Sequence, residues 1–234
     1  RVNNFDGKAY RSMIKFNTSG GLAAVWAPEN TREAIFDALA RRETYATSGP
    51  RIALRFDAGW GIDEAMIDDP GLVQHLEAAA VPMGSVLATS GQPRSPKFSV
   101  WAIRDPLDAP LQRIQMVKGW IDDAGQTHEN VVDIACADGL QVDPTTGRCP
   151  DNGASVELST CQYSAGSGAT ELKTVWRDPD YDPNQSAFYY ARVLMNPTCR
   201  WSSFDAIRLG REPDPRVPAT IQERAWSSPV WLRP

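Results

Sequence analysis

The chain has 234 residues, of which 42% are hydrophobic and 23% charged, a composition typical of a soluble globular protein. Acidic residues outnumber Lys and Arg by 29 to 24. The resulting net charge of −5 argues against a nucleic-acid partner, which would require a concentrated excess of basic side chains. The longest apolar run, residues 22 to 27, is far shorter than the roughly 20 residues that cross a bilayer, so we expect no membrane span.

The N-terminus begins at Arg1 and shows neither an initiator Met nor the basic and apolar regions of a signal peptide. We therefore expect a processed chain or a piece of a longer protein.

The first predicted elements are a strand and a helix. Residues 21 to 27 are continuously apolar and precede Pro28, which predicts a short strand buried on both faces. Residues 30 to 42 carry apolar side chains at helical spacing, and Asn30 with Glu33 would form a capping box at the N-terminus of that helix. Strand, loop and helix together make one β/α unit, of the kind that ends a parallel barrel or a layered α/β sheet.

From residue 50 onward the sequence is typical of an antiparallel β-sandwich. Short β-rich runs lie at residues 52–56, 98–102, 111–120, 131–135, 156–158, 172–176 and 188–194. Gly, Pro, Asp and Asn separate them, and a weaker helix is predicted at 70–80. The predicted fold class is α+β, mostly β, with the β/α unit in residues 1–49 and the sandwich in residues 50–234.

The four cysteines are Cys136, Cys149, Cys161 and Cys199, and they lack the short paired spacing of a zinc site. In a Pro-rich β domain we favour two disulfides, pairing Cys136 with Cys149 and Cys161 with Cys199, among three possible connectivities. This predicts a periplasmic or secreted bacterial protein. Four buried free thiols in a cytosolic protein remain the alternative.

Several longer segments carry a family resemblance. They are GLAAVWAPENTREAIFDAL at 21–39, RRETYATSGPRI at 41–52, LQRIQ at 111–115, KGW at 118–120, CPDNGA at 149–154 and ERAWSSPVW at 223–231. These segments resemble the C-terminal part of the DUF3604 family, proteins of unknown function related to the PHP (polymerase and histidinol phosphatase) metal-dependent hydrolases. The resemblance covers nearly the whole chain.

The resemblance implies that the β/α unit is the last one of a PHP-like barrel and that the sandwich follows it. PHP-type enzymes bind two or three divalent metals, such as Zn, Mn or Fe, through an early His-x-His motif, and hydrolyse a phosphoester or related bond with metal-activated water. His75 and His128 are the two histidines here, and neither lies in such a motif. The implied chain binds no metal alone, is itself inactive, and works on a small-molecule ester together with the upstream barrel portion of the same protein.

The candidate catalytic residues are Glu29, Asn30 and Arg32, because the active site of a β/α barrel lies at the C-terminal ends of its strands. The alternative is an exposed carboxylate at a helix N-terminus, with Asn30 as a cap and Arg32 in a surface ion pair. Tyr45 and Ser48, at the crossover into the sandwich, are candidate substrate-binding residues. A tight structural joint is their alternative. No metal ligand is assigned.

Two further patterns lead to a second functional hypothesis. Asp178, Asp180, Asp182 and Asn184 imitate the start of a calcium loop, but Pro183 and Tyr189 stand where Gly and Glu are required, so a solvated loop is favoured. The eight Trp would suit a sugar-binding platform, although core packing explains Trp60, Trp101, Trp120 and Trp176 as well. The alternative function is therefore a non-catalytic binding or structural module, with a glycan as one ligand. A family member that kept the fold and lost the metals is a third hypothesis.

Overall fold

The structure is a computed structural model that describes residues 20–234. Its helices are α2 (Arg32–Arg41), the 3-10 turn η1 (Glu64–Met66), α3 (Leu72–Ala79) and α4 (Trp201–Arg208). The longer strands are β3 (Ala53–Gly59), β6 (Lys97–Ile103), β7 (Leu111–Ile121), β8 (Thr127–Cys136), β11 (Glu171–Arg177) and β12 (Ala187–Met195). The shorter ones are β1 (Leu22–Val25), β2 (Thr44–Thr47), β4 (Val81–Pro82), β5 (Val86–Ala88), β9 (Val156–Glu157), β10 (Gln162–Tyr163), β13 (Thr198–Cys199), β14 (Thr220–Ile221), β15 (Arg224–Ser227) and β16 (Val230–Arg233).

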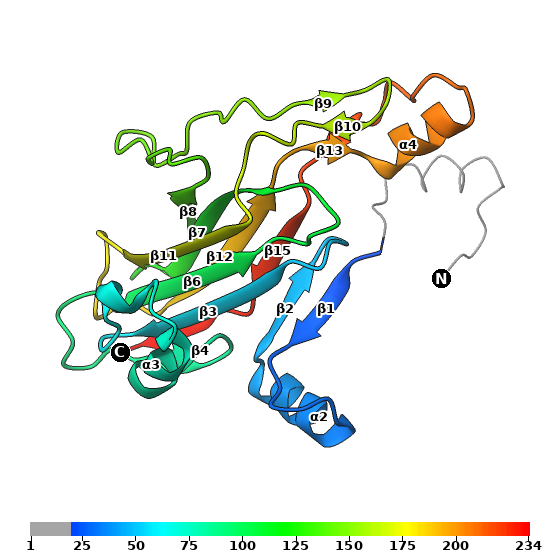
Figure 1. The fold of residues 1–234 in the computed structure, drawn as a ribbon. Helices are drawn as coiled ribbons and strands as arrows, with labels where there is room; N and C mark the ends of the chain where they lie inside the picture. The colour runs from blue at the N-terminus through cyan, green and yellow to red at the C-terminus, as the bar shows by residue number, and fades with distance from the viewer. Residues whose placement is uncertain (1–19) are drawn as a thin grey trace, which may run out of the picture.

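Two sheets pack face to face around β12 (Figure 1). In the larger sheet β12 pairs with β7 along one edge and with β15 and β16 along the other. Beyond β7 the sheet continues with β8. Beyond β15 it continues with β2 and then β1. β5 pairs with β16 and is the one parallel strand of this sheet among the described residues. The smaller sheet has the order β11-β6-β3-β4 and is antiparallel throughout. The predicted mostly β, antiparallel architecture is confirmed.

Alternation along the strands builds one core between the sheets. Its members include Leu54, Phe56, Phe98 and Val100 from the smaller sheet and Tyr189, Ala191, Val193 and Met195 from β12. The rings of Phe98 and Tyr189 lie 4.5 Å apart at its centre. Trp176 packs on the same Phe98, so this tryptophan does contribute to the core, as expected.

The predicted helix is present, but its N-terminal cap is not the expected one. Thr31, in an extended conformation, accepts a hydrogen bond from the Ala34 amide, and the helix starts at Arg32. The prediction that Asn30 forms a capping box with Glu33 is therefore wrong by one position. Arg42 ends the helix in the left-handed region at φ 60°. The weaker helix predicted at 70–80 is confirmed as α3.

The strand before α2 also differs from the prediction. β1 pairs antiparallel with β2, so residues 20–234 do not show the parallel pairing of a β/α unit. It lies at the edge of the larger sheet, and the side chains of Leu22 and, just beyond it, Trp26 are each 42% exposed rather than buried on both faces. These side chains are exposed because β1 is an edge strand, and no other described strand pairs with its outer edge.

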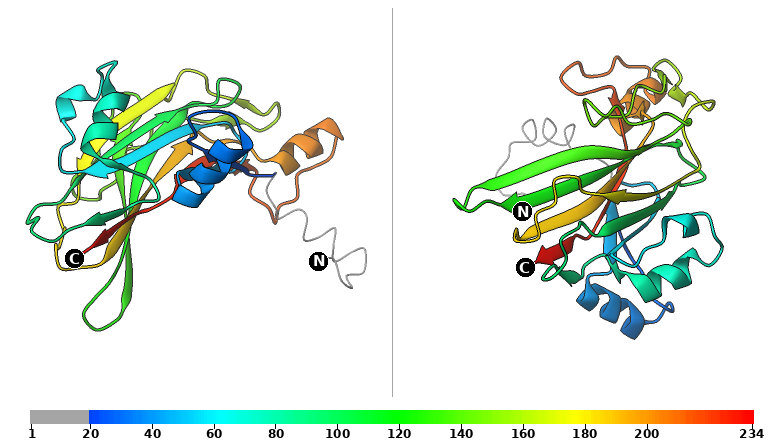
Figure 2. Two further views of the ribbon diagram at one scale, coloured as in Figure 1. Left: turned by 90° about the horizontal axis from the view of Figure 1, so that it is seen from below. Right: turned by 90° about the vertical axis from the view of Figure 1, so that its left-hand side faces the viewer.

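The helices divide between two ends of the sandwich. α2 and α3 lie on the same side of the molecule, while α4 lies away from them beside β13 (Figure 2). α3 covers the outer face of the smaller sheet, where Leu72 and Leu76 pack with Ile62 and Trp101.

Both favoured disulfides are present, Cys136–Cys149 with Cα atoms 5.6 Å apart and Cys161–Cys199 with Cα atoms 5.4 Å apart. No cysteine is free, so the alternative of four buried thiols is wrong. Two disulfides indicate a location outside the cytoplasm. Among the helices of the described residues, none has the length and apolar character that crossing a bilayer requires.

The loop after β11 was expected to be solvated, yet its first carboxylate is buried. Asp178 Oδ2 accepts hydrogen bonds of 2.6 Å from both Lys118 Nζ and Tyr189 Oη, and Lys118 also donates to the Asp180 carbonyl oxygen at 2.8 Å. Burial and the Asp178 carboxylate raise the pKa of Tyr189 far above its ordinary value, so the phenol remains a donor. The Asp178 side chain therefore neutralises a lysine inside the sandwich instead of facing solvent or an ion.

Candidate functional site

A buried carboxylate lies on the outer face of the smaller sheet. On β3, Leu54 and Phe56 point into the core, so the intervening Arg55 and the following Asp57 point the other way. Only 2% of Asp57 is exposed. Arg55 Nε donates to Asp57 Oδ2 at 2.9 Å, and a second, longer bond of 3.4 Å joins the same two side chains. The alternation of one strand thus places an ion pair beneath the surface.

Burial raises the pKa of Asp57 above its ordinary value of 3.8. The Arg55 guanidinium acts in the opposite direction, whereas the carboxylates of Glu77 and Glu43 add to the increase. Glu43 is itself bound to Arg41, with Arg41 Nη2 2.8 Å from Glu43 Oε2. A buried carboxyl group with a raised pKa is suited to donate or accept a proton.

A cavity of about 410 Å³ opens beside this carboxylate, and we call it the Asp57 cavity. Its walls come from the loop of Trp26 to Pro28, the C-terminal end of α2, and the facing residues of β3, α3 and β4. Trp26 is fixed there because its indole Nε1 donates to the Leu54 carbonyl oxygen at 2.9 Å. The Asp57 cavity combines three carboxylates with the guanidinium groups of Arg41 and Arg55, so it suits a small polar ligand better than an apolar one.

The predicted catalytic residues lie next to this cavity but do not line it. Glu29 and Asn30 are exposed in the loop that follows Pro28, and Arg32 is exposed at the start of α2. Glu29 Oε1 accepts a hydrogen bond from the Thr31 hydroxyl at 3.2 Å. Their neighbours Ala27 and Pro28 do line the cavity.

The predicted substrate-binding residues lie elsewhere. Tyr45 is half-buried against the main core, 6.4 Å from the Trp26 ring. Ser48 follows β2, where its hydroxyl donates to Glu223 and accepts from the Arg224 amide at 2.9 Å. Because Leu22 pairs with Thr47 and Val25 with Thr44, Ser48 and Glu29 lie at opposite ends of the β1–β2 pair. The structure does not bring the two predicted sets into one site.

Comparison with protein-family models identifies the family of this chain. A family model described as "Protein of unknown function (DUF3604)" matches residues 2–234. The chain belongs to the DUF3604 family. Searches of the curated proteins and of the solved structures found no match to this DUF3604 chain.

The described part of this DUF3604 chain does not fit a metal centre. Within residues 20–234 no three His, Cys, Asp or Glu side chains lie close enough to hold a metal ion. His75 Nε2 accepts a hydrogen bond from the Asp63 amide at 2.9 Å, and His128 Nε2 lies 2.7 Å from Asp122 Oδ2. The two histidines are thus engaged separately, on α3 and on β8.

Sequence reasoning missed Asp57 as a candidate in this DUF3604 chain. The signal was a charged residue directly after the alternating run 52–56, on the face that a half-exposed strand turns to solvent. That pattern predicts an exposed Asp. Asp57 is buried because α3 packs over this face and β4 pairs with β3 directly at Asp57, opposite Pro82.

Proposed function

We propose that this chain is the C-terminal part of an exported, PHP-like metal-dependent hydrolase, whose metal-binding barrel belongs to another part of the same protein. The sandwich packs against that barrel and supports it. A small-molecule phosphoester or related ester is the substrate class, and divalent metals in the barrel would supply activated water. No three candidate ligand side chains lie together within residues 20–234, so we assign this part of the chain positioning and binding roles.

The observation that carries this proposal is the outward apolar face of α2. Ala34 and Ala38 of α2 are buried, whereas Phe36 and Leu39, on the opposite side of the helix, are 67% and 51% exposed. The outer edge of β1 is unpaired among the described strands, and Leu22 is exposed there too. Neighbouring apolar side chains and an open strand edge are the features of a surface that another element covers.

This arrangement also keeps the candidate catalytic residues available. Glu29, Asn30 and Arg32 are exposed beside α2, so a barrel docked on α2 would bring them near its own site. Tyr45 and Ser48 already have partners inside the sandwich, and for them we propose a supporting role at the joint.

The test compares this chain with the whole protein, measuring bound metal by plasma mass spectrometry and hydrolysis of generic phosphoesters. We expect two or more metal equivalents and hydrolysis in the whole protein and neither in this chain. In the whole protein, Phe36→Glu with Leu39→Glu should lower the melting temperature, whereas the control Leu107→Glu, at a side chain that is 90% exposed, should not. A whole protein that is metal-free and inert would overturn the proposal.

A second candidate function, glycan binding, is favoured by one observation. Trp120, His128, Phe188 and Trp231 line a cavity of about 630 Å³ at the end of the larger sheet. The Trp120 and His128 rings stack at 5.2 Å, and Trp231 lies 5.2 Å from Phe188. Titration with a panel of neutral oligosaccharides tests this function. Binding that Trp231→Ala abolishes would favour the module, and no binding to any member would count against it.

A further inference from the structure

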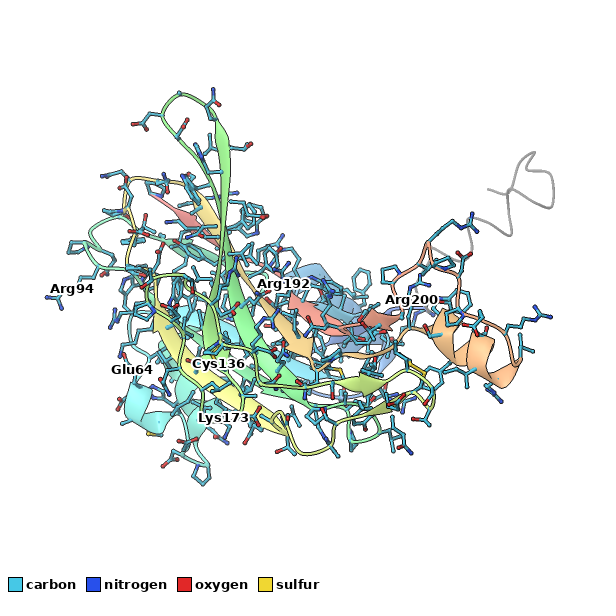
Figure 3. All side chains as sticks on the ribbon, turned by 90° about the horizontal axis from the view of Figure 1, so that it is seen from above. Glu64, Arg94, Cys136, Lys173, Arg192 and Arg200 are labelled. Carbon is cyan, nitrogen blue, oxygen red and sulfur yellow. A yellow bond between two sulfur atoms is a disulfide. The ribbon has the colours of Figure 1, made fainter. Side chains whose placement is uncertain are left out.

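Four arginine side chains gather on the outer face of the larger sheet. Arg113 comes from β7, Arg192 from β12, Arg224 from β15 and Arg148 from the loop closed by the Cys136–Cys149 disulfide. Leu194 of β12 pairs with both Arg113 and Arg224, so these arginines share the face on which Arg192 also lies, two residues away along β12. Figure 3 labels Arg192 on this central strand and Cys136 at the end of β8.

A cavity of about 570 Å³ is lined by two of these side chains, Arg113 and Arg148, and we call it the arginine pocket. Arg192 and Arg224 flank it, because each donates a hydrogen bond to a lining residue, Gln115 or Gln222. Arg113 and Gln115 of β7 form its floor together with Asp133 of β8. The segment from Arg148 to Ala154 forms one wall. The disulfide ties that wall to β8, so the position of Arg148 is covalently restrained.

The carboxylates of the arginine pocket are fewer than the arginines that line or flank it. Its carboxylates are Asp133 and Asp151. Asp133 already accepts hydrogen bonds from Gln115 Nε2 at 2.6 Å and from the Cys149 amide at 2.7 Å, and Asp151 accepts one from the Gly153 amide at 3.0 Å. The guanidinium nitrogens nearest to Asp133, on Arg113 and Arg148, are 3.7 and 3.5 Å away. The two lining arginines are thus balanced in number by two partly occupied carboxylates, and the surplus of positive charge comes from the flanking Arg192 and Arg224.

Several donor groups of the lining and flanking arginines remain without acceptors, although Arg113 Nη1 donates to Gln112. Arg113 Nε is buried and has no hydrogen-bond partner among the described residues. Arg192 and Arg224 each use Nε, toward Gln115 at 2.7 Å and toward the Gln222 carbonyl oxygen at 3.1 Å, which leaves the ends of both guanidinium forks for another acceptor. Burial lowers the pKa of Arg113, and the charges of the three other arginines add to that effect.

We propose that the arginine pocket binds the phosphate or sulfate group of a small molecule. A tetrahedral oxyanion accepts hydrogen bonds from several directions, as two lining and two flanking guanidinium groups from separate segments require, whereas one planar carboxylate matches a single fork. Its charge would offset the repulsion among the arginines. This binding site requires neither a metal nor a second part of the protein, so it is independent of the function proposed above.

Aromatic side chains continue the same face and offer a surface for the rest of such a molecule. Trp226 pairs with Arg192 across β15 and β12 and lies 6.0 Å from the Arg224 guanidinium. Tyr190 precedes Arg192 by two residues and shares its face. An aromatic phosphate ester would therefore contact both the arginine pocket and these rings.

The test is calorimetric titration of the 234-residue chain with inorganic phosphate, sulfate and phenyl phosphate, with ionic strength held constant by chloride. We expect at least one anion to bind. Its Kd should rise about tenfold in Arg113→Gln and in Arg148→Gln, as loss of one charge-assisted hydrogen bond predicts. Arg94→Gln is the matched control, because Arg94 is exposed on a distant loop (Figure 3), and it should leave Kd unchanged.

Tighter binding of phenyl phosphate would identify an ester as the ligand, and tighter binding of the inorganic anions would identify the free ion. Both results support the site. Heats no larger than those of added chloride, or an equal loss of affinity in Arg94→Gln, would overturn it. If Arg113→Gln does not fold, Arg148→Gln decides the matter, since its side chain is 48% exposed and its removal leaves the core intact.

Discussion

The inner and outer faces of β7 and β12 differ in how completely their charged side chains are paired. Inside the sandwich, Lys118 of β7 meets Asp178 and Tyr189, and each buried polar group there has a partner at 2.6 Å. On the outer face of the same two strands, Arg113 and Arg192 belong to a group of four arginines with two partly occupied carboxylates. A buried charge must be matched within the fold, whereas a surplus is tolerated where a ligand or solvent can match it.

The largest expected effect comes from removing the anion of the buried Lys118–Asp178 pair. Asp178→Ala leaves Lys118 buried without its anion, so we expect the free energy of unfolding to fall by about 3–5 kcal/mol, measured by urea denaturation. Asp180→Ala is the control, because Asp180 contacts Lys118 through its backbone carbonyl and its side chain is exposed. A loss below about 1 kcal/mol for Asp178→Ala would show that the core does not depend on this neutralisation.

The next effect concerns the wall of the arginine pocket. Replacing Cys136 and Cys149 by Ser opens a loop with a sequence separation of 13 residues and should cost about 3 kcal/mol in the free energy of unfolding. Because the wall is then free to move, we also expect weaker phosphate binding by calorimetry. The Cys161–Cys199 pair does not itself line the arginine pocket, although Cys199 pairs with the lining residue Thr220, so its removal should weaken phosphate binding less than removal of Cys136–Cys149. Equal losses of affinity in both double variants would contradict this account.

Asp57 is an intermediate case, a buried charge that its cation matches incompletely. Its pKa is raised by burial in the folded state, so the protonated form contributes stability at acidic pH, and that stability is lost as pH rises through the folded pKa. Asp57→Asn cannot ionise. We therefore expect the variant to gain stability relative to the wild type between about pH 3 and pH 7, measured by urea denaturation across that range.

Asp68→Asn, at an exposed position, controls for the general effect of removing a carboxylate. Parallel stability curves for Asp57→Asn and the wild type would show that Arg55 fully compensates for the burial of Asp57.

The smallest expected effect comes from replacing one arginine on the outer face of the larger sheet. Without an oxyanion, Arg148→Gln should change the free energy of unfolding by less than about 0.5 kcal/mol, because its side chain is half exposed and meets Asp133 only at 3.5 Å. Denaturation in phosphate-free and sulfate-free buffer checks this. A loss of several kcal/mol would make Arg148 a structural residue.

Local pattern predicted the strands of the sandwich well, since alternation from Phe98 to Ala102 and from residue 188 to 194 depends on facing one core. The same reasoning failed where contacts between distant segments determine the position of a strand in its sheet. Nothing in the run at residues 21 to 27 shows that β1 lies at a sheet edge, and the antiparallel pairing with β2 depends on the larger sheet as a whole. The cap differed by one residue because Thr31 and Asn30 are both good N-cap residues.

The candidate sites were harder to predict than the fold. The sequence pattern of its own loop predicts a solvated Asp178, whereas its role depends on Lys118, sixty positions earlier in the chain. The four arginines that line or flank the arginine pocket likewise come from three strands and a loop, and none of them lies in a local pattern typical of an anion site. Such sites depend on register between strands, which a single sequence does not reveal.

The Cys136–Cys149 bond also determines what a protease could do to this molecule. Residues 143 to 146 form an exposed loop tip inside the disulfide ring, the kind of place where proteases cut. A single cut there would leave two polypeptides joined through sulfur, with Arg148 still beside Cys149. The nicked protein would migrate as one molecule on a non-reducing gel and as two after reduction, and it would keep the wall of its arginine pocket until it met a reductant.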